Sequence, residues 1–233
     1  MRSIDSSPLA KSLMAFLVFA VILVGWRLYG RYQQSHATLP ESGTAAGECA
    51  LWFLGSSSIH RWTSLEQDMA PWKTENRGID GATLADILPR FGNIRPKKEG
   101  RPRAMVVYVG ENDIAAGVPV RTVMHQLAGL FDLRDRLLPG VPVLLLSAKP
   151  SPGRAAYLGE QRLFNAAAQN FLPHMRAAHY ADITSPLFAG GKLGENYQPD
   201  GVHMNANGYR IWSQVVRRRL QDILPDATRN CAG

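Results

Sequence analysis

The sequence has very little cysteine, and it has no cluster of residues typical of a metal site. Only two cysteines occur in 233 residues, Cys49 and Cys231. Neither has the spacing of a zinc site or the neighbours that activate a catalytic thiol. We therefore expect no metal ion in this protein. The two thiols are either unrelated or, if the domain lies outside the cytoplasm, joined in a disulfide.

Internal repeats and low-complexity segments are also absent. The 21 glycines and 15 prolines are spread singly through the chain, and 45% of the residues are hydrophobic. This composition excludes disordered, collagen-like and repeat proteins. A chain of 233 residues is long enough for one domain with its own core and some additional sequence.

The excess of positive charge is small. Lysine and arginine number 26 against 19 acidic residues, which gives a formal net charge of +7. The densest basic stretch, residues 95–103, is interrupted by Pro96, Gly100 and Pro102 and contains no aromatic residue. We interpret it as a solvated loop, and we expect no nucleic-acid partner.

Long hydrophobic runs are confined to one place, the N-terminus. Residues 13–26 carry no charge and leave no polar face for a soluble helix. A cleaved signal peptide needs small residues just after the run, but Trp26 and Arg27 occupy that place. We therefore predict an uncleaved transmembrane anchor over residues 1–32, a flexible tether over 33–48 and a catalytic domain over 49–233.

After the tether, strand and helix patterns alternate. Short apolar runs predict strands at 50–55, 104–110 and 141–147, with weaker candidates at 73–77 and 180–183. Helical spacing predicts helices at 83–91, 119–138, 157–179 and 206–224. This order predicts an α/β fold, a doubly wound and mostly parallel five-stranded sheet flanked by helices. Such sheets bind ligands at the loops after the strands.

Two of these loops are rich in serine or glycine. Residues 55–59 follow the first strand and place serines at a strand-to-helix turn, where a hydroxyl is exposed near a helix N-terminus. Residues 76–83 carry Gly78 and Gly81 before a helix, where a backbone N–H can point into a cleft. Each pattern alone is equally typical of an ordinary turn.

Two further segments supply the remaining groups of an acyl-transfer site. Residues 110–113 place the amide of Asn112 at a strand end, where it can donate to an oxyanion. Asp200 and His203 lie three residues apart just before the last helix. An imidazole base needs a carboxylate that fixes its tautomer, and this one segment supplies both groups.

With these four segments in this order, residues 50–224 resemble the SGNH/GDSL hydrolase family, particularly its bacterial esterase- and lipase-like members. The resemblance implies a flavodoxin-like SGNH fold with Ser57 as nucleophile, His203 as base and Asp200 as orienting acid. It assigns the oxyanion hole to Ser57, Gly81 and Asn112. The family signature has aspartate before the serine, where this chain has Ser56, and that aspartate is not the triad acid.

The resemblance implies a serine esterase that hydrolyses a small acyl ester, on a polar or carbohydrate-like alcohol, without a cofactor. Two alternatives use the same fold: an O-acyltransferase that acts on an envelope polysaccharide, and an inactive carbohydrate-binding domain. Loops carrying Lys149 and Tyr197 are expected to line the cleft. With the predicted anchor, the family places the domain on the outer side of a bacterial inner membrane.

Overall fold

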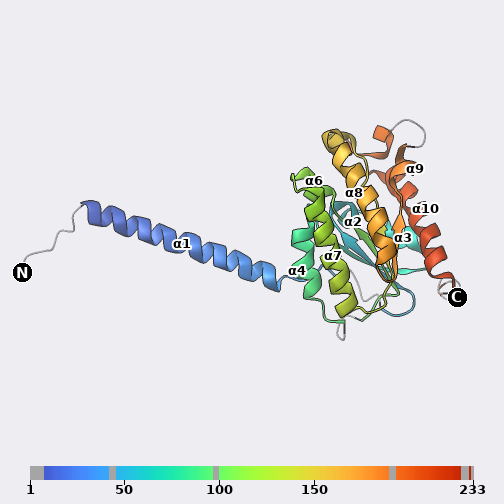
Figure 1. Ribbon diagram of the computed structural model, residues 1–233, viewed down its shortest axis with the longest axis horizontal. Coiled ribbons are helices and arrows are strands. Elements are labelled where there is room, and N and C mark those ends of the chain that lie inside the picture. The colour runs from blue at the N-terminus through green and yellow to red at the C-terminus, as the bar shows by residue number, and fades with distance from the viewer. Residues whose placement is uncertain (1–7, 42–45, 97–99, 189–192, 227–230, 232–233) are drawn as a thin grey trace, which may run out of the picture. The chain divides into compact units, whose positions relative to one another are not determined.

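The computed structural model describes residues 8–41, 46–96, 100–188, 193–226 and 231 (Figure 1). The chain divides into two compact units, Met1–Ala37 and Thr38–Gly233, which are described separately. The second unit contains all the strands of the described chain and every predicted site residue.

The second unit is built on a five-stranded parallel sheet. In chain order the strands are β1 (Ala50–Gly55), β2 (Lys73–Gly78), β3 (Ala104–Tyr108), β4 (Val143–Leu146) and β5 (Ala178–Ala181). Their order across the sheet is β2-β1-β3-β4-β5. All four pairings are parallel. The predicted doubly wound fold is confirmed, and the order is that of flavodoxin-like sheets.

The central strands are apolar along their whole length because both of their faces are covered. In β1, Trp52 and Leu54 enter one hydrophobic core, whereas Leu51 and Phe53 enter the other. Alternate side chains of a strand point to opposite faces, so a strand between two helical layers shows no apolar–polar alternation.

Helices cover both faces of the sheet (Figure 1). One face packs against α4 (Leu84–Gly92), α7 (Val120–Leu137) and α8 (Leu158–Phe171). The other packs against α3 (Leu65–Met69), α9 (Thr184–Phe188) and α10 (Ala206–Ile223). The shorter elements are α2 (Ser57–His60), α6 (Glu111–Ala115), η1 (Pro152–Tyr157), η2 (Leu172–His174) and η3 (Leu193–Asn196).

One predicted helix was too long. Residues 157–179 were expected to be a single helix, but α8 ends at Phe171, and β5 begins at Ala178. Pro173 explains the break, since a proline restricts the residue before it and cannot continue the hydrogen-bond ladder of a helix.

The first unit contains a single described helix, α1 (Pro8–His36). No helix among the described residues combines the length and the apolarity needed to cross a membrane. The predicted anchor over residues 1–32 is therefore not supported. Its charge-free part, residues 13–26, is shorter than the roughly 20 residues that a span requires.

The flexible tether was predicted over residues 33–48, of which 42–45 lie outside the described residues. Helix α1 continues through His36, and Leu39 is 3% exposed within the core of the second unit. Directly after this segment, Cys49 forms a disulfide with Cys231. This contact resolves the choice between a bridge and two unrelated thiols.

Candidate active site

The serine turn lies directly after β1, and two glycines make room for it. Ser57 is the first residue of α2 and is almost fully buried. A Cβ atom on Gly55 would lie 2.3 Å from the carbonyl oxygen of Tyr108, and one on Gly78 would lie 2.2 Å from the backbone nitrogen of His60. Neither position therefore accepts a side chain, and α2 sits tightly against the sheet edge.

Three predicted residues from opposite ends of the domain meet above this edge. Nε2 of His203 lies 3.1 Å from Oγ of Ser57, and Nδ1 of His203 lies 2.6 Å from Oδ2 of Asp200. Both are hydrogen-bonding distances, so the serine, the imidazole and the carboxylate form one continuous chain.

Asp200 is held by its own loop. Its Oδ1 accepts hydrogen bonds from the backbone N–H groups of Val202 and His203, at 2.9 and 3.0 Å. Burial would raise the pKa of Asp200, but the hydrogen bonds from the imidazole of His203 and from these two N–H groups hold that pKa well below its usual value. The carboxylate is therefore ionised over the whole neutral range.

The other two predicted residues, Gly81 and Asn112, lie on loops that are bonded to each other. Gly81 has a positive φ of 70°, and the next residue, Ala82, accepts a hydrogen bond from Nδ2 of Asn112 at 2.9 Å. Asp113 accepts the backbone N–H of Leu84 at 3.0 Å. These bonds fix the glycine turn against the start of α6.

Sequence reasoning missed an arginine beside the imidazole. Arg61 donates through Nε and Nη2 to the two carboxylate oxygens of Asp80, at 2.9 and 3.0 Å. Its Nη1 lies 3.3 Å from Nδ1 of His203. The spacing between Ser57 and Arg61 could have indicated this, because residues four positions apart in a helix lie on the same side of it.

Two residues expected to line the cleft are buried instead. Lys149 has no exposed surface and pairs with Glu111, and Tyr197 is buried with its hydroxyl donating to the carbonyl of Pro150. Ser56, which replaces the signature aspartate, precedes α2 and makes no capping hydrogen bond through its side chain.

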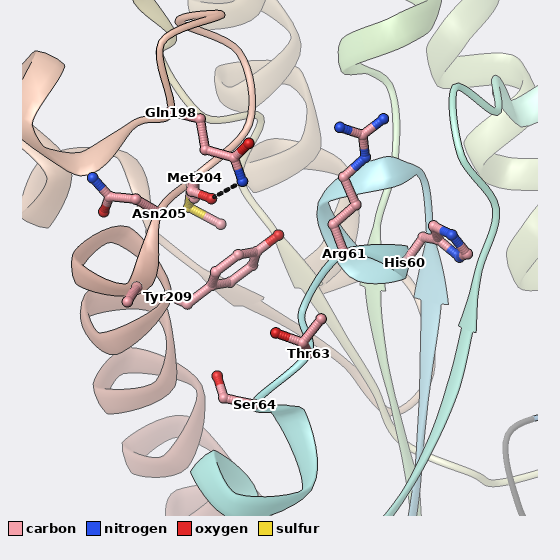
Figure 2. Close-up of a pocket in the computed structure, with 9 residues that line it drawn as sticks. His60, Arg61, Thr63, Ser64, Gln198, Met204, Asn205 and Tyr209 are labelled. Atoms are coloured by element: carbon pink, nitrogen blue, oxygen red, sulfur yellow. Dashed lines mark hydrogen bonds between the residues drawn. The ribbon is translucent and has the colours of Figure 1, made fainter.

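A pocket of about 490 Å³ adjoins the site between α2 and α10 (Figure 2). Figure 2 shows Tyr209 and Gln198 on one side of it, and Arg61 and Thr63 on the other. Hydrogen-bonding side chains and the ring of Tyr209 share the lining, and more of its exposed surface is apolar than polar. Within the described parts of the chain, no group of three or more His, Cys, Asp or Glu side chains is arranged to hold a metal ion.

Comparison with known proteins places the chain among lipases and acylhydrolases. The model of the GDSL-like lipase/acylhydrolase family matches residues 42–211. A search of curated proteins found no match.

Several solved structures share the fold. A GDSL-like lipase from Bacteroides thetaiotaomicron aligns with a TM-score of 0.62 and 21% identity, covering 84% of this chain and 98% of that one. A carbohydrate esterase family 3 protein from Talaromyces cellulolyticus aligns with a TM-score of 0.61 and 15% identity, covering 76% and 98%. The lipase/acylhydrolase from Enterococcus faecalis aligns at 0.59 and 16%, covering 75% and 96%.

Proposed function

Because the chain belongs to the GDSL-like lipase/acylhydrolase family, we propose that it is a serine esterase that hydrolyses a small acyl ester through an acyl-enzyme intermediate. The observation that carries this proposal is the hydrogen-bonded chain from Ser57 through His203 to Asp200. Nucleophile, base and orienting acid are each within hydrogen-bonding reach of the next group.

The first half of the reaction forms the acyl-enzyme. Nε2 of His203 takes the proton of Ser57 while Oγ attacks the ester carbonyl carbon, and Asp200 accepts the hydrogen bond of Nδ1–H and stabilises the imidazolium. As the tetrahedral intermediate collapses, the alcohol leaves with the proton from Nε2. The acyl group remains bonded to Oγ.

In the second half, water replaces the alcohol. His203 takes a proton from the water as it attacks the acyl carbon, and it returns that proton to Oγ of Ser57 when the bond to the serine breaks. The products are a carboxylic acid and the free enzyme. None of these steps requires a cofactor.

The negative charge of each tetrahedral intermediate needs hydrogen-bond donors, which we assign to Ser57, Gly81 and Asn112. The backbone N–H of Ser57 begins α2, and the first N–H groups of a helix have no partner within it. Asn112 donates one amide hydrogen to Ala82, and the second hydrogen of its NH₂ group is assigned to the oxyanion. Such preorganised donors stabilise the transition state more than the substrate.

For the alcohol part of the ester we propose a polar, carbohydrate-like group. The pocket beside His203 is lined by Arg61 and Thr63 on one side and by Gln198 and Tyr209 on the other. Hydrogen-bonding side chains around an aromatic ring suit a sugar, which has hydroxyl edges and apolar faces. The similarity to a carbohydrate esterase fold agrees with this choice.

We also propose that the domain works outside the cytoplasm, in an oxidising compartment such as the periplasm. The disulfide between Cys49 and Cys231 supports this location, because such bonds persist mainly in oxidising compartments. Cells lysed in a thiol-alkylating reagent should yield both cysteines unmodified until a reductant is added, and protease added to spheroplasts should degrade the domain. Modified thiols together with full protection from protease would refute this location.

The activity is tested by labelling the protein with a fluorophosphonate and mapping the modified residue. We expect the label on Ser57, and we expect Ser57→Ala to abolish both labelling and the turnover of a chromogenic acetyl ester. Ser56→Ala is the matched control, because Ser56 lies in the same turn without a side-chain capping bond, and it should retain both. Unchanged turnover in Ser57→Ala would refute the proposal.

The same assay separates hydrolysis from acyl transfer. With an acetyl ester and a sugar acceptor present, we expect free acetate as the product and an acetate yield that does not fall as the acceptor concentration rises. Acetylated sugar as the main product would show that the acyl group passes to an alcohol instead of water.

A further inference from the structure

The domain buries a cluster of charged and polar side chains that the proposed chemical steps do not use. The carboxylate of Glu111, which is 3% exposed, accepts hydrogen bonds from Nζ of Lys149 at 3.0 and 2.8 Å and from Oγ of Ser151 at 3.0 Å. The hydroxyl of Tyr108 also donates to it, and Nη1 of Arg154 lies 3.3 Å away. We call these five residues the Glu111 cluster.

A buried charged cluster contributes little net free energy to the stability of a fold. Removing a carboxylate and an ammonium from water costs free energy that their mutual attraction only partly returns, and apolar side chains of similar volume often do as well. Burial raises the pKa of Glu111, but Lys149 and Arg154 together bring that pKa below its usual value, so the carboxylate stays ionised. The cluster therefore fixes the geometry of the segments that supply its members.

Glu111 connects the cluster to the predicted oxyanion hole. Glu111 is the first residue of α6 and directly precedes Asn112. The other side of this turn is held by the bonds from Asn112 to Ala82 and from Leu84 to Asp113. A displacement of Glu111 therefore moves the backbone that carries the Asn112 amide.

Lys149 and Ser151 connect the cluster to the segment that carries Asp200 and His203. Lys149 and Ser151 lie on the loop after β4, and this loop and the start of η1 each contact the segment before α10. The carbonyl of Pro150 accepts a hydrogen bond from the hydroxyl of Tyr197, and the N–H of Gly153 donates to the carbonyl of Gly201 at 2.9 Å. Gly201 lies between Asp200 and His203 in the chain.

We propose that Glu111 and Lys149 are positioning residues that set the spacing between the Asn112 turn and the segment from Asp200 to His203. The proposal rests on the function proposed above, since it assigns these two segments to one reaction. Both side chains are buried, so we assign neither of them to substrate contact. They act through the loop that joins the two segments.

The test compares Glu111→Gln, Lys149→Met and the double variant. Glu111→Gln leaves the buried ammonium of Lys149 without its carboxylate, and Lys149→Met leaves the carboxylate of Glu111 with Arg154 as its remaining cation, so both stability and kcat should fall in each. In the double variant both charges are gone, so much of the lost thermal stability should return, whereas kcat should stay roughly 10- to 100-fold below wild type, with KM changed less than about twofold.

The control is Arg134→Met, which removes another fully buried cation. Arg134 lies on α7 and donates to the carbonyls of Val141 and Arg176, away from the Glu111 cluster. It should lower the melting temperature without changing kcat at 25 °C. A double variant with wild-type kcat, or a loss of kcat in Arg134→Met that matches its loss of stability, would overturn the positioning role.

A readout that needs no ester turnover separates this proposal from the proposed function. The N–H between His203 and Asp200 should give a downfield proton NMR signal, and we expect that signal to shift or broaden in the double variant but not in Arg134→Met. An unchanged signal in the double variant would overturn the positioning role. Failure of wild-type protein to label at Ser57 would instead overturn the proposed function.

Discussion

At the scale of single residues, the assignment with the clearest kinetic signature is that of Asn112. Its amide is assigned to the oxyanion, which exists only in the transition state and the tetrahedral intermediates. Asn112→Ala should therefore lower kcat by about 10²- to 10³-fold and leave KM nearly unchanged. Steady-state kinetics on the acetyl ester measure both constants. A rise in KM with kcat unchanged would place Asn112 in substrate binding instead.

The ionisation of Asp200 predicts how the stability of the folded protein depends on pH. Its pKa is lowered by folding, so its ionisation stabilises the folded state at pH values above the unfolded pKa of about 3.9 and loses that effect as the pH falls further. The melting temperature of wild type should exceed that of Asp200→Asn at neutral pH, and the gap should narrow below about pH 4. A gap independent of pH throughout would show that the carboxylate charge is not the cause.

At the scale of elements, the contact between the loop after β4 and the acid–base segment leaves no space for a methyl group. A Cβ atom on Gly153 would lie 2.8 Å from the carbonyl oxygen of Asp200. Gly153→Ala should displace the Asp200 segment and lower kcat about 10-fold or more.

Gly159→Ala is the matched control for this substitution. Gly159 lies in the neighbouring helix α8, and a Cβ atom there would meet nothing within 4 Å. It should stabilise the protein by about 0.5 to 1 kcal/mol and leave kcat unchanged. Equal kinetics in the two variants would show that the loop adapts to the extra methyl group.

The sequence was sufficient to predict the elements whose residues follow a simple rule. Continuous apolar runs located β1 and β3, and the helical spacing of buried leucines located α7. The short motifs around Ser57 and around Asp200 and His203 likewise pointed to three residues that lie within hydrogen-bonding distance of one another at one edge of the sheet. For the strands and α7, local pattern and tertiary burial require the same residues.

Prediction failed where the deciding partner lies far away in the chain. Lys149 reads as a surface lysine until Glu111, 38 residues earlier, is known to face it. Nothing in the sequence singles out Arg61 until Asp80 and His203 are found beside it. The apolar run at the N-terminus predicted a membrane span, but no helix of the described part of the chain is long and apolar enough for one.

At the scale of the whole molecule, the parallel sheet assembles the site. All five strands run in one direction, so the loops that carry Ser57, Gly81 and Asn112 emerge at the same edge. The helices on both faces hold this edge rigid while leaving the loops free to carry chemistry. The amino-terminal end of the sheet has no part in the reaction and is available for structural links.

The disulfide is such a link, and it predicts separate effects on stability and activity. It joins Cys49, just before β1, to Cys231 across 182 residues, at the end of β1 opposite Ser57. Closing so long a loop restricts the unfolded chain, so replacing both cysteines by alanine should cost about 2 to 5 kcal/mol of unfolding free energy. Activity at 25 °C should be unchanged, because the bond is remote from the site. Calorimetry and ester kinetics on the double variant test this, with reduced wild type as control. A loss of kcat without a loss of stability would show that the bridge instead acts on the active site.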